Sequence, residues 1–249
     1  REALFSSLTS EFGELTDLNV LDLYAGTGAI ALESLSRGAA IVHAVEKDEQ
    51  AQKAIVANFE GLKTANCPGT FRLFGQSVHR FLQDPAPFKY HFIYIDPPYN
   101  TGSAFEKYED GLEHSVWLGL IRDRLEILSK LLTPDGVMFV QIDENEHPYL
   151  RILLHEIMGR ANFIGEFIWQ KKKGGGNDSK YIAVEHEYII ANAKNKPLLK
   201  NWFESYSEEY ATRYSESDQN GRYYWDTFKR ASGKQYYPIR CPDGSVLEF

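Results

Sequence analysis

The sequence predicts an α/β protein built on a seven-stranded, mostly parallel sheet with an antiparallel hairpin at one edge. Short apolar runs typical of buried strands alternate with segments of helical period, and this alternation indicates a parallel sheet covered by helices. The last two apolar runs follow each other without an intervening helix, which predicts the hairpin. Together these observations predict a three-layer domain over residues 1–195.

The first half of this domain is expected to contribute four strands. Residues 1–8 read as an amphipathic helix, and the apolar run NVLDLY at 19–24 predicts the first strand. A helix begins after a glycine turn and ends at Gly38. The remaining elements are a strand at 41–46, a helix over 51–62, a weaker strand at 71–74, a short helix at 78–82 and a strand at 90–95.

The second half begins with a polar stretch at 103–114. We interpret the whole segment 100–114 either as a lid over the site or as a disordered loop. Ser115 is the expected N-cap of a helix whose apolar residues recur at helical spacing up to 132. The residues TPDG at 133–136 predict a turn. A strand at 137–142, a helix at 149–158, a strand at 163–169, a basic loop at 171–180 and a last strand at 187–191 complete the domain.

Residues 196–249 differ in character, because they are rich in aromatic side chains and weakly periodic. We expect them to form an extension that packs on the domain, or part of a recognition region. Their aromatic rings suit either core packing or stacking on bases.

Composition restricts the class of protein. The chain of 249 residues carries a net charge of -8, so any contact with nucleic acid has to rely on local basic clusters. No apolar run reaches the length of about 20 residues that spans a bilayer, and we see no secretory leader. Cys67 and Cys241 lie far apart without metal-type spacing, which favours a reducing, cytoplasmic location.

A glycine turn joins the first strand to the helix that follows it. Ala25, Gly26, Thr27 and Gly28 form this turn, where glycines let the backbone approach a ligand and the helix N-terminus favours negative groups. Glu46 ends the second strand, where a carboxylate can accept hydrogen bonds from both hydroxyls of a ribose. The pattern predicts an adenosine-containing cofactor, and it does not separate a nicotinamide dinucleotide from S-adenosylmethionine.

Four further side chains are candidates for the cofactor site. Asp22 precedes the glycine turn, so we expect it on the ligand side, although an acid inside a strand is also found as a satisfied core residue. Lys47 follows Glu46. Gln76 and Ser77 follow the third strand, where they could meet an adenine ring or simply form a loop and a helix cap.

The fourth strand ends in Asp96, Pro97, Pro98 and Tyr99. The first and fourth strands are expected to be neighbours, and ligands bind at the carboxyl ends of strands at such a point. The Asp96 carboxylate and the Pro97 carbonyl can accept both N–H bonds of an exocyclic amino group, while the prolines fix the backbone. Tyr99 offers a flat surface to a base rotated out of its stack. This chemistry is methyl transfer to a base, and it requires no metal; the alternative is a rigid turn with a capping aspartate.

Two resemblances follow from longer stretches. Residues 1–95 resemble the RsmD-type ribosomal RNA guanine-N2 methyltransferases through REALFSSL, VLDLYAGTGAIALESLSRGAA and VEKDEQAQKAIVANF. Residues 96–249 resemble the modification (Mod) subunit of type III restriction systems, which are adenine-N6 DNA methyltransferases, through DPPYNTGSAFEKYED, HSVWLGLIRDRLEIL, LTPDGVMFVQIDENE and FIWQKKKGGGNDSKYIAVEHEYIIANAKN.

These resemblances imply a Rossmann-like class I methyltransferase fold and S-adenosylmethionine as cofactor. They imply nucleic acid as the substrate, with adenine N6 in DNA favoured and guanine N2 in ribosomal RNA as the alternative. A restriction subunit or a second copy of the chain are the implied protein partners, with no membrane. Mod subunits place their glycine-rich motif after the catalytic motif, whereas this chain has it in front, so a binding module without turnover is a further alternative.

The resemblance to Mod also implies a substrate-binding set. Tyr99 and Asn100, with Thr101 beyond them, would meet the target base. Lys171, Lys172 and Lys173 could follow a phosphate backbone, although a charge run of this kind is also found simply solvated.

Overall fold

A computed structural model describes residues 4–5, 15–63, 67, 69–84, 88–100, 112–171, 183–199, 212–219, 221–225, 238–241 and 243–247 of the chain. The chain divides into two units, residues 1–203 and 204–249. The first unit contains a seven-stranded sheet and the second contains two small two-stranded sheets. We describe the two units separately.

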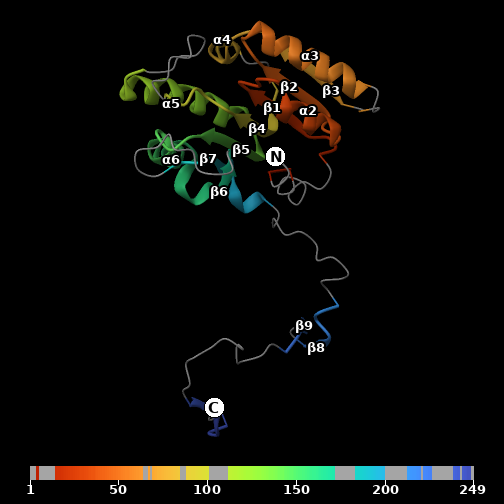
Figure 1. The fold of residues 1–249 in the computed structure, drawn as a ribbon, viewed down its shortest axis with the longest axis vertical. Helices are drawn as coiled ribbons and strands as arrows, with labels where there is room; N and C mark the ends of the chain where they lie inside the picture. The colour runs from red at the N-terminus through yellow and green to blue at the C-terminus, as the bar shows by residue number, and fades with distance from the viewer. Residues whose placement is uncertain are drawn as a thin grey trace. The chain divides into compact units, whose positions relative to one another are not determined.

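The large sheet has the strand order β3-β2-β1-β4-β5-β7-β6 (Figure 1). Its strands are β1 (Asn19–Leu23), β2 (Ile41–Val45), β3 (Thr70–Phe74), β4 (Tyr90–Ile95), β5 (Leu132–Ile142), β6 (Phe163–Gln170) and β7 (His186–Ala193). The first five run parallel, and β7 pairs antiparallel with both β5 and β6. This confirms the predicted sheet and places the hairpin at one edge, with the later strand inside.

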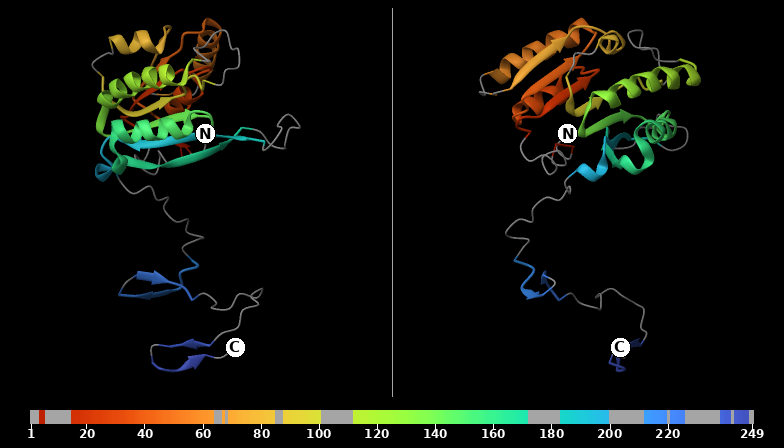
Figure 2. Two further views of the ribbon diagram at one scale, coloured as in Figure 1. Left: turned by 90° about the vertical axis from the view of Figure 1, so that its left-hand side faces the viewer. Right: turned by 180° about the vertical axis from the view of Figure 1, so that it is seen from behind.

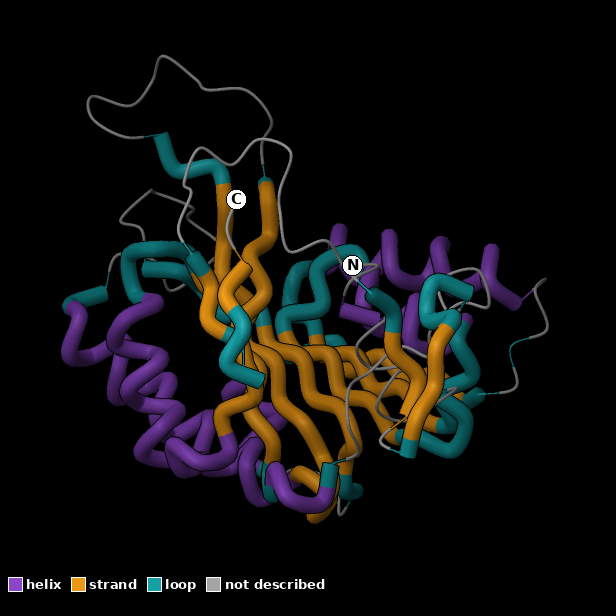
Figure 3. Tube along the Cα trace, turned by 90° about the horizontal axis from the view of Figure 1, so that it is seen from below, coloured by secondary structure: helices purple, strands orange, loops and turns teal. Residues whose placement is uncertain are grey.

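Helices cover both faces of the sheet (Figure 3). They are α2 (Ala29–Ser36), α3 (Glu49–Lys63), α4 (Val78–Gln83), α5 (His114–Leu131) and α6 (His147–Leu154), the last continued by the short helices η1 (His155–Gly159) and η2 (Arg160–Asn162). A further short helix, η3 (Lys196–Leu198), follows β7. No helix among the described residues is long and apolar enough to cross a membrane.

Strand side chains alternate between the two faces, so the core divides in two. Leu21 and Ile93 point to the face covered by α4, α5 and α6, where Trp117 is buried with them. Their neighbours Val20 and Phe92 point to the face covered by α2. Burial on both faces explains why these strands read as continuous apolar runs in the sequence.

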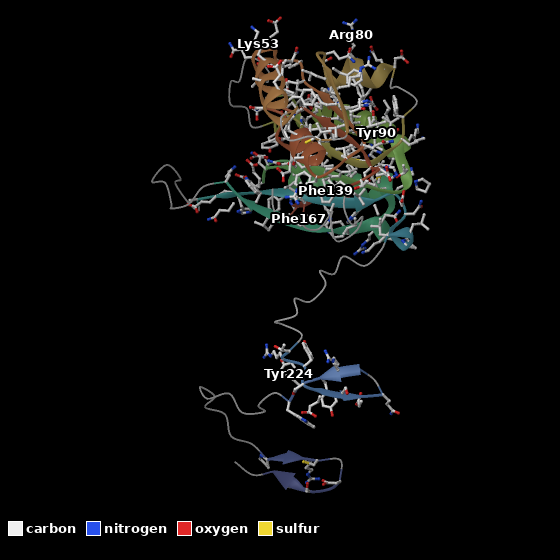
Figure 4. All side chains as sticks on the ribbon, turned by 90° about the vertical axis from the view of Figure 1, so that its right-hand side faces the viewer. Lys53, Arg80, Tyr90, Phe139, Phe167 and Tyr224 are labelled. Carbon is white, nitrogen blue, oxygen red and sulfur yellow. The ribbon has the colours of Figure 1, made fainter. Side chains whose placement is uncertain are left out.

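The β6–β7 hairpin extends past the ends of the parallel strands (Figure 2). In the middle of β6, the ring centroid of Phe167 lies 5.9 Å from that of Phe139 of β5 (Figure 4). The next two residues, Ile168 and Trp169, are exposed by 61% and 40%. The hairpin therefore packs on the core up to Phe167 and presents apolar side chains beyond it.

Two local predictions were wrong. Helix α5 begins at His114 with Glu113 as its N-cap, so Ser115 lies inside the first turn. Residues 133–136, predicted as a turn, belong to β5, whose pairing with β4 shifts register between Tyr90 and Phe92. The strand continues through Pro134 and Gly136 because its pairing is irregular at this point. Of the helix predicted over 1–8, residues 4 and 5 are described, and they are helical.

The second unit contains β8 (Glu216–Asp218) paired with β9 (Gly221–Tyr223), and β10 (Ile239–Arg240) paired with β11 (Val246–Leu247). The rings of Tyr214 and Tyr224 meet edge to face at 5.2 Å, and Arg213 lies over Tyr224. Trp225 is 81% exposed. That residues 196–249 form part of a recognition region stays a prediction.

Candidate active site

The carboxyl ends of β1 and β4 bring the two predicted motifs together. These strands are direct neighbours, with Leu23 paired to Ile95, and the Asp96 amide donates to the Leu23 carbonyl at 3.3 Å. The glycine turn and the acid–proline–proline–tyrosine turn therefore leave the sheet side by side. A cavity of about 310 Å³ opens between them, and Asp22, Gly26 and Asp96 are among its lining residues.

The glycine turn needs backbone conformations that side chains disfavour. Gly26 and Gly28 have φ values of 54° and 77°, and Tyr24 just before them has a φ of 58°. An added Cβ at Gly28 would lie 3.0 Å from Ile55 of α3, whereas one at Gly26 would meet no protein atom within 4 Å. Gly28 thus lets α2 and α3 pack closely, and Gly26 leaves the cavity open.

Asp22 is both a structural residue and a cavity residue. Its Oδ2 accepts a hydrogen bond from the Ala31 amide in the first turn of α2 at 3.0 Å, a position where Gly28, the N-cap, has no side chain to offer. The residue is 2% exposed and still lines the cavity. Burial raises the pKa of this carboxyl to about 7, and the negative charges of Asp96 and Glu46 add to the effect.

Glu46 closes the glycine turn from the neighbouring strand. One carboxylate oxygen accepts from the Gly26 amide at 2.9 Å and the other from the Asp48 amide at 2.8 Å. A second cavity, of about 130 Å³, is lined by this carboxylate with Lys47, Gln76 and Ser77 among others. Each carboxylate oxygen can accept a further hydrogen bond, so the side chain remains able to bind ribose hydroxyls.

Gln76 and Ser77, the predicted adenine contacts, line this second cavity beside Glu46. Ser77 is also the N-cap of α4, accepting from the Arg80 amide at 3.3 Å. The helix-cap interpretation of Ser77 is therefore confirmed, and a contact with adenine stays a prediction. Tyr24 lines both cavities, so they meet at the glycine turn.

The turn after β4 is held by groups that the sequence analysis did not single out. Trp117 of α5 donates its indole N–H to the Pro98 carbonyl at 2.9 Å. Burial raises the pKa of Asp96 to about 7, a hydrogen bond with Tyr99 opposes this shift, and the charge of Glu187 adds to it. The carboxyl thus changes its charge near neutral pH.

A polar network surrounds the Tyr99 hydroxyl. Gln141 of β5 donates to this hydroxyl at 2.9 Å and to the Glu187 carboxylate at 2.7 Å. The hydroxyl lies 3.3 Å from the same carboxylate, and Tyr94 donates to the Gln141 side-chain oxygen. Gln141 could have been noticed, because it is a polar residue inside the otherwise apolar run VMFVQI. The network fixes the ring of Tyr99 from its polar end.

The remaining predicted substrate residues divide into two groups. Asn100 donates to Glu146 at 2.8 Å, and the Lys171 ammonium lies 3.5 Å from the Glu187 carboxylate. Lys171 is therefore beside the site, but within an ion pair. Thr101, Lys172 and Lys173 lie outside the described residues. Trp169 lines the larger cavity and was not predicted as a site residue.

The side chains fit a cationic adenosine cofactor. Asp22, Glu46 and Asp96 converge where the two motifs meet, close enough for the charges of Asp96 and Glu46 to raise the pKa of Asp22. A positive sulfonium would relieve the mutual repulsion of these carboxylates. The open space at Gly26 admits a ligand close to the backbone. Glu46 would bind the ribose, and the residues of the smaller cavity would bind the base of the cofactor.

The fold and this cofactor site define a class I methyltransferase domain that uses S-adenosylmethionine. Residues 1–163 match the family described as "Conserved hypothetical protein 95", and residues 90–247 match the family described as "DNA methylase". The chain belongs to both families, which overlap over residues 90–163. The match to two families confirms the double resemblance noted in the sequence.

Three curated relatives illustrate the two resemblances, to Mod subunits and to ribosomal RNA methyltransferases. The Mod subunit of the probable type III restriction-modification enzyme HindVI from Haemophilus influenzae is 38% identical over 141 residues, covering 54% of this chain and 19% of that protein. The StyLTI Mod subunit from Salmonella typhimurium is 31% identical, covering 69% of this chain and 32% of that protein. Ribosomal RNA small subunit methyltransferase D from Escherichia coli is 33% identical, covering 47% of this chain and 55% of that protein. The chain thus spans less than two thirds of each of these relatives.

Solved structures support the fold. A S-adenosylmethionine-dependent methyltransferase from Agrobacterium tumefaciens aligns with a TM-score of 0.55 at 17% identity, covering 78% of this chain and 61% of that one. A putative RNA methyltransferase from Pyrococcus horikoshii aligns with a TM-score of 0.50 at 18% identity, covering 78% of this chain and 82% of that one. At this level of identity the alignments establish the fold alone.

Proposed function

We propose that this chain methylates an exocyclic amino group of a nucleic-acid base, with N6 of adenine in DNA as its substrate. The observation that carries the proposal is the position of Asp96, Pro97, Pro98 and Tyr99 at the end of β4, beside the glycine turn that ends β1. Both turns border one cavity. The similarity to Mod subunits supports DNA, because that similarity extends over the larger part of the chain.

The chain's own residues can activate an amino group. An exocyclic nitrogen is planar because its lone pair is conjugated with the ring. The amino group would donate one hydrogen bond to the Asp96 carboxylate and one to the Pro97 carbonyl. These hydrogen bonds would draw the lone pair out of that conjugation. The two prolines hold these acceptors in place before the base arrives. Asp96 then stabilises the positive charge on nitrogen and can take the proton that the nitrogen loses.

S-Adenosylmethionine, when bound, supplies a methyl group from a positively charged sulfur. Asp22, Glu46 and the backbone at Gly26 would hold it, and Tyr99 would support the target base. Gln141 and Glu187 keep the Tyr99 hydroxyl engaged, so its ring is presented in one orientation. Lys171 and the two lysines after it remain candidates for phosphate contacts, and a restriction subunit or a second copy remain candidate partners in a cytoplasmic setting.

A second candidate function is methylation of guanine N2 in ribosomal RNA. The match of residues 1–163 to the first family and the similarity to ribosomal RNA small subunit methyltransferase D favour it. A third is a module that binds cofactor without turnover, since the glycine turn at residues 25–28 precedes the motif at residues 96–99, the reverse of the order in Mod subunits.

Incubation with S-adenosylmethionine labelled on its methyl group separates these candidates. We expect label in duplex DNA, recovered as N6-methyladenine, and none in ribosomal RNA. Label only in RNA would replace the DNA assignment. The Asp96→Ala variant should bind the cofactor in calorimetry and transfer no label. A wild-type chain that binds cofactor and labels neither nucleic acid would favour the binding module.

A further inference from the structure

The position of Glu146 is unfavourable for a carboxylate unless specific partners stabilise it. It is the N-cap of α6, a position where serine, threonine, aspartate and asparagine are preferred, and its side chain makes no capping hydrogen bond. The residue is nevertheless 4% exposed. A buried carboxylate is costly unless it is paired, so its partners explain its position.

Those partners are the two ends of the segment that follows the catalytic turn. The Asn100 amide donates to one carboxylate oxygen of Glu146 at 2.8 Å. Nδ1 of His114, the first residue of α5, lies 2.9 Å from one carboxylate oxygen and 3.1 Å from the other. One carboxylate therefore connects the residue after Tyr99 to the start of the helix that carries Trp117.

Asn100 needs such support, because its φ of 59° lies in the left-handed region. Asparagine enters that region more readily than most residues that carry a side chain, and a contact to its side chain can hold it there. The contact with Glu146 holds the chain in this conformation directly after Tyr99. Trp117 holds the Pro98 carbonyl from the same helix. The turn is thus fixed on both sides of the aromatic ring.

The carboxylate itself is held in a rigid turn after β5. Asp143 accepts hydrogen bonds from the backbone amide of Asn145 at 3.1 Å and from its side chain at 2.7 Å. Glu146 follows directly, and β5 lies beside β4 in the sheet. The support is therefore connected to the core and does not depend on an exposed loop.

We propose that Glu146 is a positioning residue that, through Asn100 and His114, sets the conformation of the catalytic turn. This inference rests on the proposed function, because the turn is catalytic only if the chain transfers a methyl group. Glu146 touches neither of the two cavities, so we expect it to affect turnover and not cofactor binding.

The test compares Glu146→Ala and Glu146→Gln with Glu144→Gln, an exposed acid in the same turn. At saturating substrates, Glu146→Ala should lower the rate of methyl transfer about tenfold or more, the scale of a lost hydrogen bond to a charged group. Its dissociation constant for S-adenosylmethionine should stay within about twofold of wild type. Glu146→Gln keeps an acceptor for Asn100, so its rate of methyl transfer should lie between those of the wild type and Glu146→Ala. Asn100→Ala combined with Glu146→Ala should be no slower than the slower single variant.

A second readout does not require turnover. Hydrogen exchange of the peptide covering residues 93–100 should be faster in Glu146→Ala than in Glu144→Gln, because the turn loses an anchor. Equal exchange in these two variants, or equal rates of methyl transfer in them when the wild type is active, would overturn the proposal. If the wild type labels no nucleic acid while exchange still rises in Glu146→Ala, the positioning role stands and the proposed function fails.

Discussion

The indole N–H of Trp117 and the carbonyl oxygen of Pro98 are joined by a hydrogen bond of 2.9 Å. This contact connects the helix α5, which packs on the sheet through one face, to a turn whose two prolines cannot donate hydrogen bonds of their own. Because Trp117 is 2% exposed, the donor is fixed in the core. The position of the turn is therefore determined by packing of α5 on the sheet.

Replacement of Trp117 by phenylalanine keeps an aromatic side chain and removes the donor. We expect turnover to fall about fivefold or more, since a partly buried acceptor is left without its partner. The measurement is methyl transfer at saturating substrates on folded protein. Val116→Ala, at the neighbouring position of the same helix that is 47% exposed, is the control and should behave as wild type. Equal turnover in both variants would mean that the Pro98 contact does not position the turn.

Cofactor binding should depend on pH through Asp22 and Asp96. Burial raises the pKa of each to about 7, so both gain negative charge between pH 6 and 8. A sulfonium cation should therefore bind more tightly as pH rises, by about tenfold across this window. Calorimetry at several pH values measures this dependence. S-Adenosylhomocysteine, which lacks the sulfonium charge, is the control, and an equal pH dependence for both ligands would contradict the assignment.

The two glycines of the turn should respond differently to alanine. Gly28→Ala forces a side chain into a left-handed conformation and against Ile55 at 3.0 Å, so the free energy of unfolding should fall by about 2 kcal/mol. Gly26→Ala meets no protein neighbour, so it should destabilise less and weaken S-adenosylmethionine binding about tenfold or more. Denaturant unfolding and calorimetry separate the effects. Normal cofactor binding by Gly26→Ala would show that the ligand does not approach this backbone.

The charge of Glu187 should tune Asp96. Its negative charge contributes to the raised pKa of that carboxyl, so Glu187→Gln should lower the pKa. The rate of methyl transfer should then rise at lower pH than in wild type, because Asp96 must be ionised to accept the amino protons. A pH–rate profile provides the measurement. Glu185→Gln, which changes the charge two residues away, should leave the profile in place, and an identical shift in both variants would assign it to general electrostatics.

Much of the site could be predicted because its residues sit in contiguous motifs. Gly26 and Gly28 are recognisable from the strand and helix around them, and Asp96 through Tyr99 from the abrupt end of an apolar run. Glu46 follows from its place at the end of the second strand. These predictions require only that parallel strands end at the same edge of a sheet, which is a property of the fold class.

The supporting residues could not be predicted in this way. Glu146 lies 46 residues from Asn100, and Gln141 lies 42 residues from Tyr99. Neither pair has a spacing that identifies it. Trp117 is part of an apolar helical pattern, which by itself predicts only a core residue, and its N–H reaches the turn through the fold. Residues 133–136 were predicted as a turn because local propensity favours one, and pairing with β4 overrode it.

The sequence by itself determined the order of strands and helices along the chain, the glycine turn after β1 and the acid–proline–proline–tyrosine motif after β4, because each depends on neighbours along the chain. Only the tertiary structure decided which side chains hold those residues in place. It also decided the protonation of Asp22 and Asp96, since burial and the charges of Glu46 and Glu187 act through space. Hydrogen bonds and Coulomb interactions depend on distance between atoms, and that distance exists only once the sheet has formed.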